Sequence, residues 1–297
     1  MDPRVAELAG RLEQTGYLCD DELATVLFLS LQMGRPLLLE GEPGTGKTAL
    51  AEAIAQALDQ PLVRLQCYEG IDATQALYDW DFPRQILHLR ALEALSGSDP
   101  AGGERRNLEE AEKSLYDERF LLARPVLAAL QQAPAVLLID EVDRADDEFE
   151  AFLLEVLSTF QVTIPELGTV QASTPPTVVL TSNRTRELHD ALKRRCLYHW
   201  IDHPGLDREV AIVRSRAPEV SAELARQVVD VVQRLRDTED LIKAPGVAET
   251  LDWARALQHL GTTELDVETA ALTLGALVKH RDDAERARAA IDRMLAR

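Results

Sequence analysis

The sequence is poor in cysteine and has no long hydrophobic run. Its three cysteines, Cys19, Cys67 and Cys196, are far apart and form no Cys-x-x-Cys pair. This spacing is typical of reduced thiols that pack as small apolar groups, and it gives no sign of a disulfide framework. The longest apolar segment, residues 23–34, is too short and too interrupted to span a bilayer.

The sequence also has few basic residues for its acidic content. Lysine and arginine together number 32, aspartate and glutamate number 51, and the formal net charge is −19. Such a surface repels nucleic-acid phosphates and anionic lipids, and no local basic patch offsets it. The N-terminus has no apolar core after a basic start, as a signal peptide would. We therefore expect a cytoplasmic protein that binds proteins and small ligands, with neither nucleic acid nor a membrane as a partner.

Apolar runs alternate with helical periodicity through about two thirds of the chain. Continuous apolar strands separated by helices are typical of a parallel sheet that is covered on both faces. The predicted fold class is therefore α/β. The runs that predict strands are residues 35–41, 61–67, 134–141, 176–183 and 196–202.

Two insertions and a change in hydrophobic periodicity complete the predicted domain organisation. Residues 94–107 are rich in glycine, serine and proline and predict a loop. Residues 161–171 contain two β-leaning runs around Pro-Glu-Leu-Gly and predict a hairpin. After this α/β part, only helical periodicity remains. We expect a large α/β domain over residues 1–204 and a small all-helical domain over residues 205–297.

Residues 41–48, GEPGTGKT, match the phosphate-loop pattern G-x-x-x-x-G-K-[ST] between a predicted strand and a predicted helix. Gly44 and Gly46 allow backbone angles that let successive amide groups curl around phosphate oxygens. Lys47 adds a mobile positive charge, Thr48 can bind magnesium, and the following helix points its positive end at the same anion. The predicted nucleotide-binding residues are Gly41, Glu42, Pro43, Gly44, Thr45, Gly46, Lys47 and Thr48.

Asp140 and Glu141 end the apolar run at residues 134–141. Two adjacent carboxylates at a buried strand end would repel each other and lose solvation unless a cation or water met them. Asp140 is therefore predicted to hold magnesium through water, and Glu141 to polarise an attacking water molecule. The pair favours hydrolysis of ATP or GTP over a nucleoside kinase, because the acceptor of a kinase is not water.

Three further residues complete a candidate catalytic group with Glu141. Asn183 ends a predicted strand and could sense the γ-phosphate or the lytic water, although asparagine is also common in turns. Arg194 and Arg195 close a predicted helix, where arginine favours the helix dipole in any protein. They could instead enter a neighbouring subunit's site and stabilise transition-state charge, an effect worth about 10³ to 10⁵ in rate.

The stretches GEPGTGKT, LLIDEVDRAD, TSN and ALKRRCLYHWIDHP, in this order and with a helical tail, resemble the MoxR group of AAA+ ATPases. The hairpin stretch FLLEVLSTFQVTIPELGTV and the RRCLYHW stretch are similar to its CoxD-like branch. That branch is associated with maturation of carbon monoxide dehydrogenase and related molybdenum hydroxylases. The nucleotide motifs are shared by many ATPases, whereas these two stretches are much more specific. The resemblance covers nearly the whole chain from Gly16 onward.

The resemblance implies ATP and Mg²⁺ as cofactors and an ATP-driven ring, commonly a hexamer. Such a ring remodels a client protein or helps to insert its metal centre. The implied partners are a protein with a von Willebrand factor A domain and a metalloenzyme client. Carried over by motif, Asn183 is the first sensor, and Arg195 is the arginine finger with Arg194 beside it. The hairpin would face the client or the pore.

The chain departs from this family at the start of one lid helix. AAA+ lids often carry a sensor arginine there, but Ala, Gly and Val surround Pro245, and Lys243 is the nearest cation. How the lid would respond to nucleotide is therefore open. A second class of function is a nucleotide-gated recruitment module, in which ATP binding rather than turnover carries the function. A DNA-dependent motor shares the motifs but is disfavoured by the negative charge.

Overall fold

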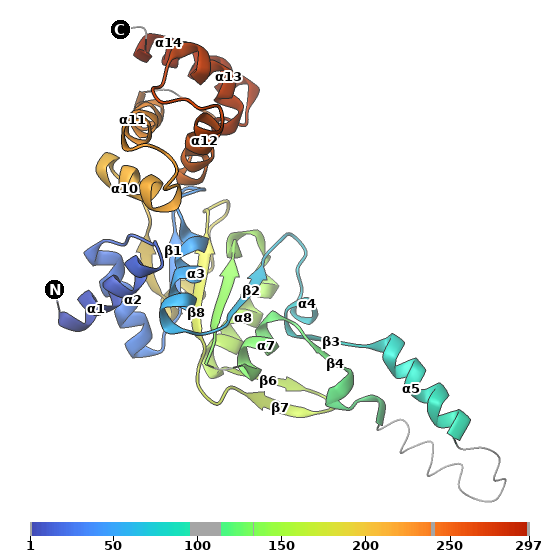
Figure 1. Cartoon of the computed structure of the whole chain (residues 1–297). Coiled ribbons are helices and arrows are strands. Elements are labelled where there is room, and N and C mark those ends of the chain that lie inside the picture. The colour runs from blue at the N-terminus through green and yellow to red at the C-terminus, as the bar shows by residue number, and fades with distance from the viewer. Residues whose placement is uncertain (1, 96–113, 133, 239–240, 296–297) are drawn as a thin grey trace, which may run out of the picture.

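A five-stranded parallel sheet forms the centre of the computed structural model, which describes residues 2–95, 114–132, 134–238 and 241–295 (Figure 1). The strand order is β2-β5-β8-β1-β9, and each neighbouring pair is parallel. The predicted α/β fold class is confirmed. The strands are β1 (Leu37–Glu40), β2 (Leu62–Gln66), β5 (Val136–Asp140), β8 (Thr177–Ser182) and β9 (Leu197–Trp200).

Helices cover both faces of the sheet because successive strand residues point to opposite sides. In β1, Leu38 packs into one hydrophobic core, whereas Leu37 and Leu39 pack into another. Burial on both faces explains why the strand sequences are apolar without alternation. The core around Leu38 includes α4 (Ala73–Leu77), α7 (Pro125–Gln131), α8 (Asp147–Thr159) and α9 (Asp190–Arg195). The core around Leu37 includes α1 (Pro3–Gln14), α2 (Asp21–Met33) and α3 (Lys47–Leu58).

A second, antiparallel pair of strands was not predicted. β3 (Tyr78–Trp80) and β4 (Leu121–Ala123) have three residues each, which is too short for a periodic signal in the sequence. After β3, α5 (Phe82–Leu95) projects away from the sheet in Figure 1. Of the loop predicted over residues 94–107, the first two residues end α5 and residues 96–107 lie outside the described residues.

Residues 161–171 form the antiparallel hairpin β6 (Gln161–Ile164) and β7 (Gly168–Gln171). Buried and exposed side chains alternate along β6, and Val162 and Ile164 join the same core as α7 and α8. Gly168 starts β7 with φ at 91°, a left-handed conformation that glycine adopts readily in a turn. The hairpin is therefore anchored by one row of side chains, while β7 stays largely exposed.

Beyond β9 the described residues form helices only, which Figure 1 shows gathered at the end of the molecule opposite α5. They enclose a core of their own, around the fully buried Trp253. The Trp253 indole N–H donates a hydrogen bond to Thr273 Oγ1 over 2.8 Å, so this buried polar group is satisfied. The helices are α10 (Leu206–Arg216), α11 (Ala222–Thr238), α12 (Val247–His259), α13 (Val267–Leu277) and α14 (Arg281–Leu295).

Within the described ranges, no helix combines the length and the apolar character that crossing a membrane requires.

Candidate active site

The glycine-rich loop joins β1 to α3, and two of its glycines adopt left-handed conformations. The φ angle is 80° at Gly44 and 96° at Gly46. Lys47 is only 6% exposed and folds back over the loop. Its ammonium donates to the carbonyl oxygen of Gly41 over 2.7 Å and to that of Glu42 over 2.8 Å. Burial lowers the pKa of Lys47, and neighbouring carboxylates oppose that shift.

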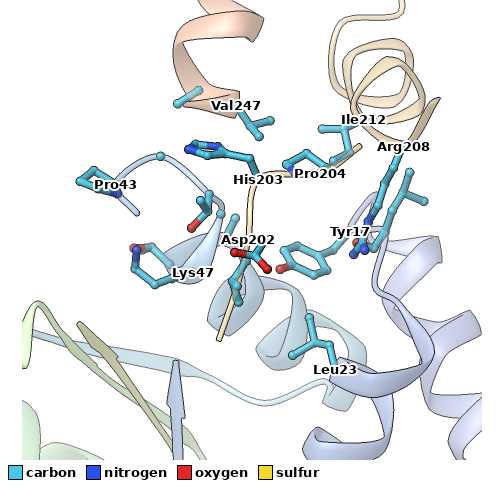
Figure 2. A pocket seen from close by; sticks show the side chains of 18 of the residues that line it. Tyr17, Leu23, Pro43, Lys47, Asp202, His203, Pro204, Arg208, Ile212 and Val247 are labelled. Atoms are coloured by element: carbon cyan, nitrogen blue, oxygen red, sulfur yellow. The ribbon is translucent and has the colours of Figure 1, made fainter. Parts of the chain in front are cut away.

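A cavity of about 750 Å³ opens over this loop. The volume suits a ligand the size of a nucleotide. Figure 2 shows Lys47 and Tyr17 on the side of the sheet, and Val247 of α12 on the side of the C-terminal helices. Gly41 and Glu42 do not line the cavity, and they contribute their carbonyl groups to Lys47 instead. The predicted site residues that line it are Pro43, Gly44, Thr45, Gly46, Lys47, Thr48, Asp140, Glu141 and Asn183.

The carboxylate of Asp140, at the end of β5, is buried and meets three side chains. The hydroxyl groups of Thr48 and Thr181 both donate to Oδ1, over 3.1 Å and 2.5 Å. The Arg64 guanidinium donates to Oδ2 over 2.6 Å. The two predicted magnesium ligands, Thr48 and Asp140, are therefore in direct contact, as a shared cation site requires.

Glu141 leaves the strand in a left-handed conformation with φ at 54°, which is uncommon for a non-glycine residue and clusters at functional sites. Its carboxylate accepts hydrogen bonds from Gln66 Nε2 over 3.0 Å and from Arg144 over 3.2 Å. The Asn183 side-chain amide lies 3.5 Å from the other carboxylate oxygen. The backbone N–H of Asn183 donates to the buried carboxylate of Asp143 over 3.2 Å. The structure thus brings Glu141 and Asn183 together at one rim of the cavity.

Arg194 and Arg195 end α9 with exposed side chains, and neither lines the cavity of its own chain. Their backbone carbonyl groups accept hydrogen bonds from the Arg35 guanidinium, over 2.6 Å for Arg194 and 3.1 Å for Arg195. The backbone at this helix end is therefore fixed while the two guanidinium groups lie away from the other predicted catalytic residues.

The start of α12 contacts the loop through backbone atoms. The Val247 N–H donates to the Gly44 carbonyl over 2.9 Å, and a Cβ at Gly246 would lie 2.7 Å from the Gly44 Cα. Lys243, the cation nearest to the missing sensor arginine, does not line the cavity, and its N–H donates to Asp283. Three arginines from α10 and α12 line the cavity: Arg208, Arg216 and Arg255.

Several cavity residues were missed by sequence reasoning because they come from connections far apart in the chain. Tyr17 follows α1, and burial raises its pKa. His203 follows β9; burial lowers its pKa, and its buried Nδ1 has no hydrogen-bond partner among the described residues. Arg208 donates to the Leu18 carbonyl over 2.8 Å and to Asp20 over 2.7 Å, so it ties α10 to the segment before α2. No motif links these positions, and only the fold brings them together.

The phosphate loop, the acidic strand end and the polar end of β8 converge on one cavity at the carboxyl edge of the sheet, where α/β folds bind ligands. Residues 36–196, more than half of the chain, match the model of the family described as AAA domain, dynein-related subfamily. The chain belongs to this family. Its AAA domain match includes the loop, both adjacent carboxylates, Asn183 and both α9 arginines. The predicted AAA+ class is confirmed at this level, and the CoxD-like branch stays a prediction.

Several known proteins are similar in sequence to this AAA protein, each at low identity. An uncharacterized protein of Staphylococcus epidermidis is 24% identical over 269 residues, which cover 86% of the chain and 89% of the relative. Gas vesicle ATPase GvpN1 of Halobacterium salinarum is 25% identical over 221 residues, covering 71% of the chain and 59% of the relative. Midasin of Giardia intestinalis is 27% identical over 241 residues, covering 72% of the chain and 5% of midasin. Among solved structures, the RuvB Holliday junction branch migration motor of Thermotoga maritima is 18% identical with a TM-score of 0.46, covering 86% of this chain and 66% of that one.

Proposed function

We propose that the chain binds ATP with magnesium and hydrolyses it. The contact between the phosphate loop and the acidic strand end carries this proposal, since Thr48 Oγ1 lies 3.1 Å from the Asp140 carboxylate. Beside that contact, Lys47 and Glu141 line the same cavity. A loop able to hold phosphate groups thus meets a carboxylate able to take a proton from water, which is the combination that nucleotide hydrolysis needs.

The donor groups of the site fit a nucleotide with its cation. The first turn of α3 has no side-chain cap, because Gly46 is its N-cap residue, so its backbone N–H groups are available to phosphate oxygens. Thr48 and Asp140 would hold magnesium, which when bound neutralises phosphate charge. Lys47 would turn its ammonium from the loop carbonyl groups to the phosphates. The roles proposed for the whole loop, Gly41 to Thr48, rest on this fit.

Glu141 and Asn183 are proposed to act together on the water molecule. Glu141 would orient the water and take its proton, and Asn183, 3.5 Å from the Glu141 carboxylate, would hold the γ-phosphate or the water in line. A general base of this kind contributes about 10² to 10⁴ in rate.

We further infer a head-to-tail ring, with a hexamer as the expected size. Arg194 and Arg195 are exposed and lie outside the cavity of their own chain, so an arginine finger at Arg195 would have to act in a neighbouring subunit's site. Contacts of this heterologous kind form a ring when the rotation between neighbouring subunits closes. In this proposal the α/β domain is residues 1–204, the helical lid is residues 205–297, and the site lies between them and the next subunit.

The wider role that we propose is that of a cytoplasmic MoxR-type chaperone of the CoxD-like branch. It would remodel a molybdenum hydroxylase such as carbon monoxide dehydrogenase, or assist its metal-centre maturation, with a von Willebrand factor A domain protein as partner. The sequence resemblance supports this role, as does the similarity to a relative named as a gas vesicle ATPase. The exposed strand β7 of the hairpin at residues 161–171 is the proposed client-facing element.

Substitution of Glu141 by Gln tests hydrolysis. We expect the Glu141→Gln variant to bind ATP and to release phosphate about 10² to 10⁴ times more slowly than the wild type, because the amide cannot take a proton. Phosphate release and binding of a fluorescent ATP analogue would be measured at several protein concentrations. Glu155→Gln, the same change at an exposed position of α8, is the matched control and should keep full turnover.

Two results would contradict the proposal: a wild type that releases no phosphate with Mg²⁺ and ATP at any concentration, or a Glu141→Gln variant with normal turnover. The same variant separates turnover from gating. If it binds ATP and still supports maturation of the client, ATP binding alone carries the function and the recruitment module is the better description.

A further inference from the structure

An arginine on the neighbouring strand occupies one side of the Asp140 carboxylate. Arg64 lies on β2, which pairs in parallel with β5, so its side chain reaches the end of that strand. One of its guanidinium nitrogens donates to Asp140 Oδ2 over 2.6 Å. The Asp140 side chain is 4% exposed and that of Arg64 is 51% exposed. The Asp140 carboxylate is therefore buried, whereas the half-exposed Arg64 guanidinium can move toward solvent.

The same guanidinium nitrogen also holds the second carboxylate of the site, through one intermediate. It donates to Gln66 Oε1 over 2.7 Å, and Gln66 Nε2 donates to Glu141 Oε2 over 3.0 Å. Arg64 and Gln66 point to the same side of β2 because they are two residues apart in a strand. Arg64 and Gln66 thus connect the Asp140 carboxylate to the Glu141 carboxylate through a continuous chain of hydrogen bonds.

Burial makes this arrangement dependent on a positive charge. A buried carboxylate without a cation loses solvation that hydroxyl donors replace only in part. Within the described part of the chain, Arg64 makes the only ion pair of Asp140, and Thr48 and Thr181 supply neutral hydroxyl groups. Arg64 therefore supplies the charge that a metal cation at the same carboxylate would otherwise supply.

We propose that Arg64 is a positioning residue that competes with the metal cation for the Asp140 carboxylate. This inference rests on the proposed function. In the structure Arg64 pairs with Asp140 and is linked to Glu141 through Gln66. When Asp140 is taken by the cation, Arg64 loses its anionic partner and moves out. Glu141 would keep its contacts with Arg144 and Asn183.

Competition predicts that removing Arg64 tightens cation binding. In Arg64→Met, which keeps the apolar stem and removes the charge, the Mn²⁺ concentration for half-maximal binding of a fluorescent ATP analogue should fall about three- to tenfold. That range corresponds to the typical net contribution of one hydrogen bond, because solvent screens the half-exposed Arg64. The melting temperature without cation should also fall, because Asp140 is then buried without its ion pair. Arg124→Met is the matched control, since Arg124 is exposed to a similar extent as Arg64 and pairs with Asp79, which is exposed and, unlike Asp140, does not line the cavity.

A second variant keeps the test valid if Arg64→Met folds poorly. Arg64→Lys restores a cation beside Asp140, so its Mn²⁺ midpoint should return toward that of the wild type. An Arg64→Met midpoint equal to or above that of the wild type, with Arg124→Met as reference, would overturn the inference. A wild type that binds no analogue, with or without Mn²⁺, would overturn the proposed function instead.

Discussion

At the scale of single residues, the site is marked by polar groups whose ordinary partners are absent or unusual. Lys47 is held by backbone carbonyl groups of its own loop, and Glu141 adopts a left-handed backbone. His203 has a buried Nδ1 without a hydrogen-bond partner in the described part of the chain. Such features cost stability and are kept where function requires them.

His203 predicts a pH dependence of stability. Burial, reinforced by the Arg236 guanidinium and opposed by Glu209, lowers the pKa of His203 below its ordinary value of 6.5. The unfolded chain therefore binds a proton first, so this residue lowers the free energy of unfolding as pH falls below about 6.5. We expect His203→Gln to lose less melting temperature than the wild type between about pH 7.5 and pH 5.5. Equal losses in both proteins would contradict this role of His203.

Site residues that belong to one local motif could be predicted from the sequence. Site residues that only the fold brings together could not. The loop at residues 41–48 and the pair Asp140 and Glu141 are each short stretches whose chemistry is complete within the sequence. Arg64 and Gln66 matter because β2 lies beside β5, and strand order is not encoded locally. Tyr17 and His203 reach the cavity from two connections that no periodicity relates.

At the scale of elements, the contact that stands out is between the start of α12 and the phosphate loop. It involves backbone atoms of Gly246, Val247 and Gly44, so it needs no side-chain charge. The missing sensor arginine was visible in the sequence, but this contact was not, because it depends on how the C-terminal helices lie over β1. The five sheet strands were predictable, since each is an apolar run of ordinary strand length.

Gly246→Ala should push α12 away from the loop. The new Cβ would lie 2.7 Å from Gly44 Cα and 2.9 Å from the Pro43 carbonyl oxygen, both backbone atoms that cannot rotate away. Overpacking of this kind costs about 1–3 kcal/mol, so we expect nucleotide affinity to fall by about fivefold or more. Titration with a fluorescent ATP analogue measures the effect. Gly275→Ala is the matched control, because Gly275 lies in α13 and does not line the cavity, and a Cβ added there would meet nothing within 4 Å. Equal affinities of the two variants would show that the contact is dispensable.

At the scale of the whole molecule, the exposed end of α9 leaves one predicted catalytic group outside the cavity that it should serve. The finger at Arg195 and the loop at Lys47 belong to different sites if the ring proposal is correct. This separation allows a test in which two variant proteins are mixed, and the test does not depend on knowing the ring size.

Arg195→Ala and Lys47→Ala should each abolish most ATP turnover, and mixing the two proteins should restore part of it. In a head-to-tail ring, some sites combine an intact Lys47 with an intact Arg195 from the neighbour. Random mixing in equal amounts makes about a quarter of the sites complete. Phosphate release by the mixture, compared with each variant alone at the same total concentration, measures this recovery. Complete absence of recovery from variants that assemble normally would place Arg195 outside the neighbour's site.

The hydrogen bonds of Arg208 tie the start of α10 to the segment before α2. Arg208 stands near the start of α10, and its guanidinium grips Leu18 and Asp20, which lead into a helix lying on the sheet. A rotation of α10 that kept these hydrogen bonds would therefore move residues 18–20 with it. In the proposed ATP cycle such a movement would pass through α2 and the hydrophobic core that it shares with α1, and so reach a helix that does not line the cavity.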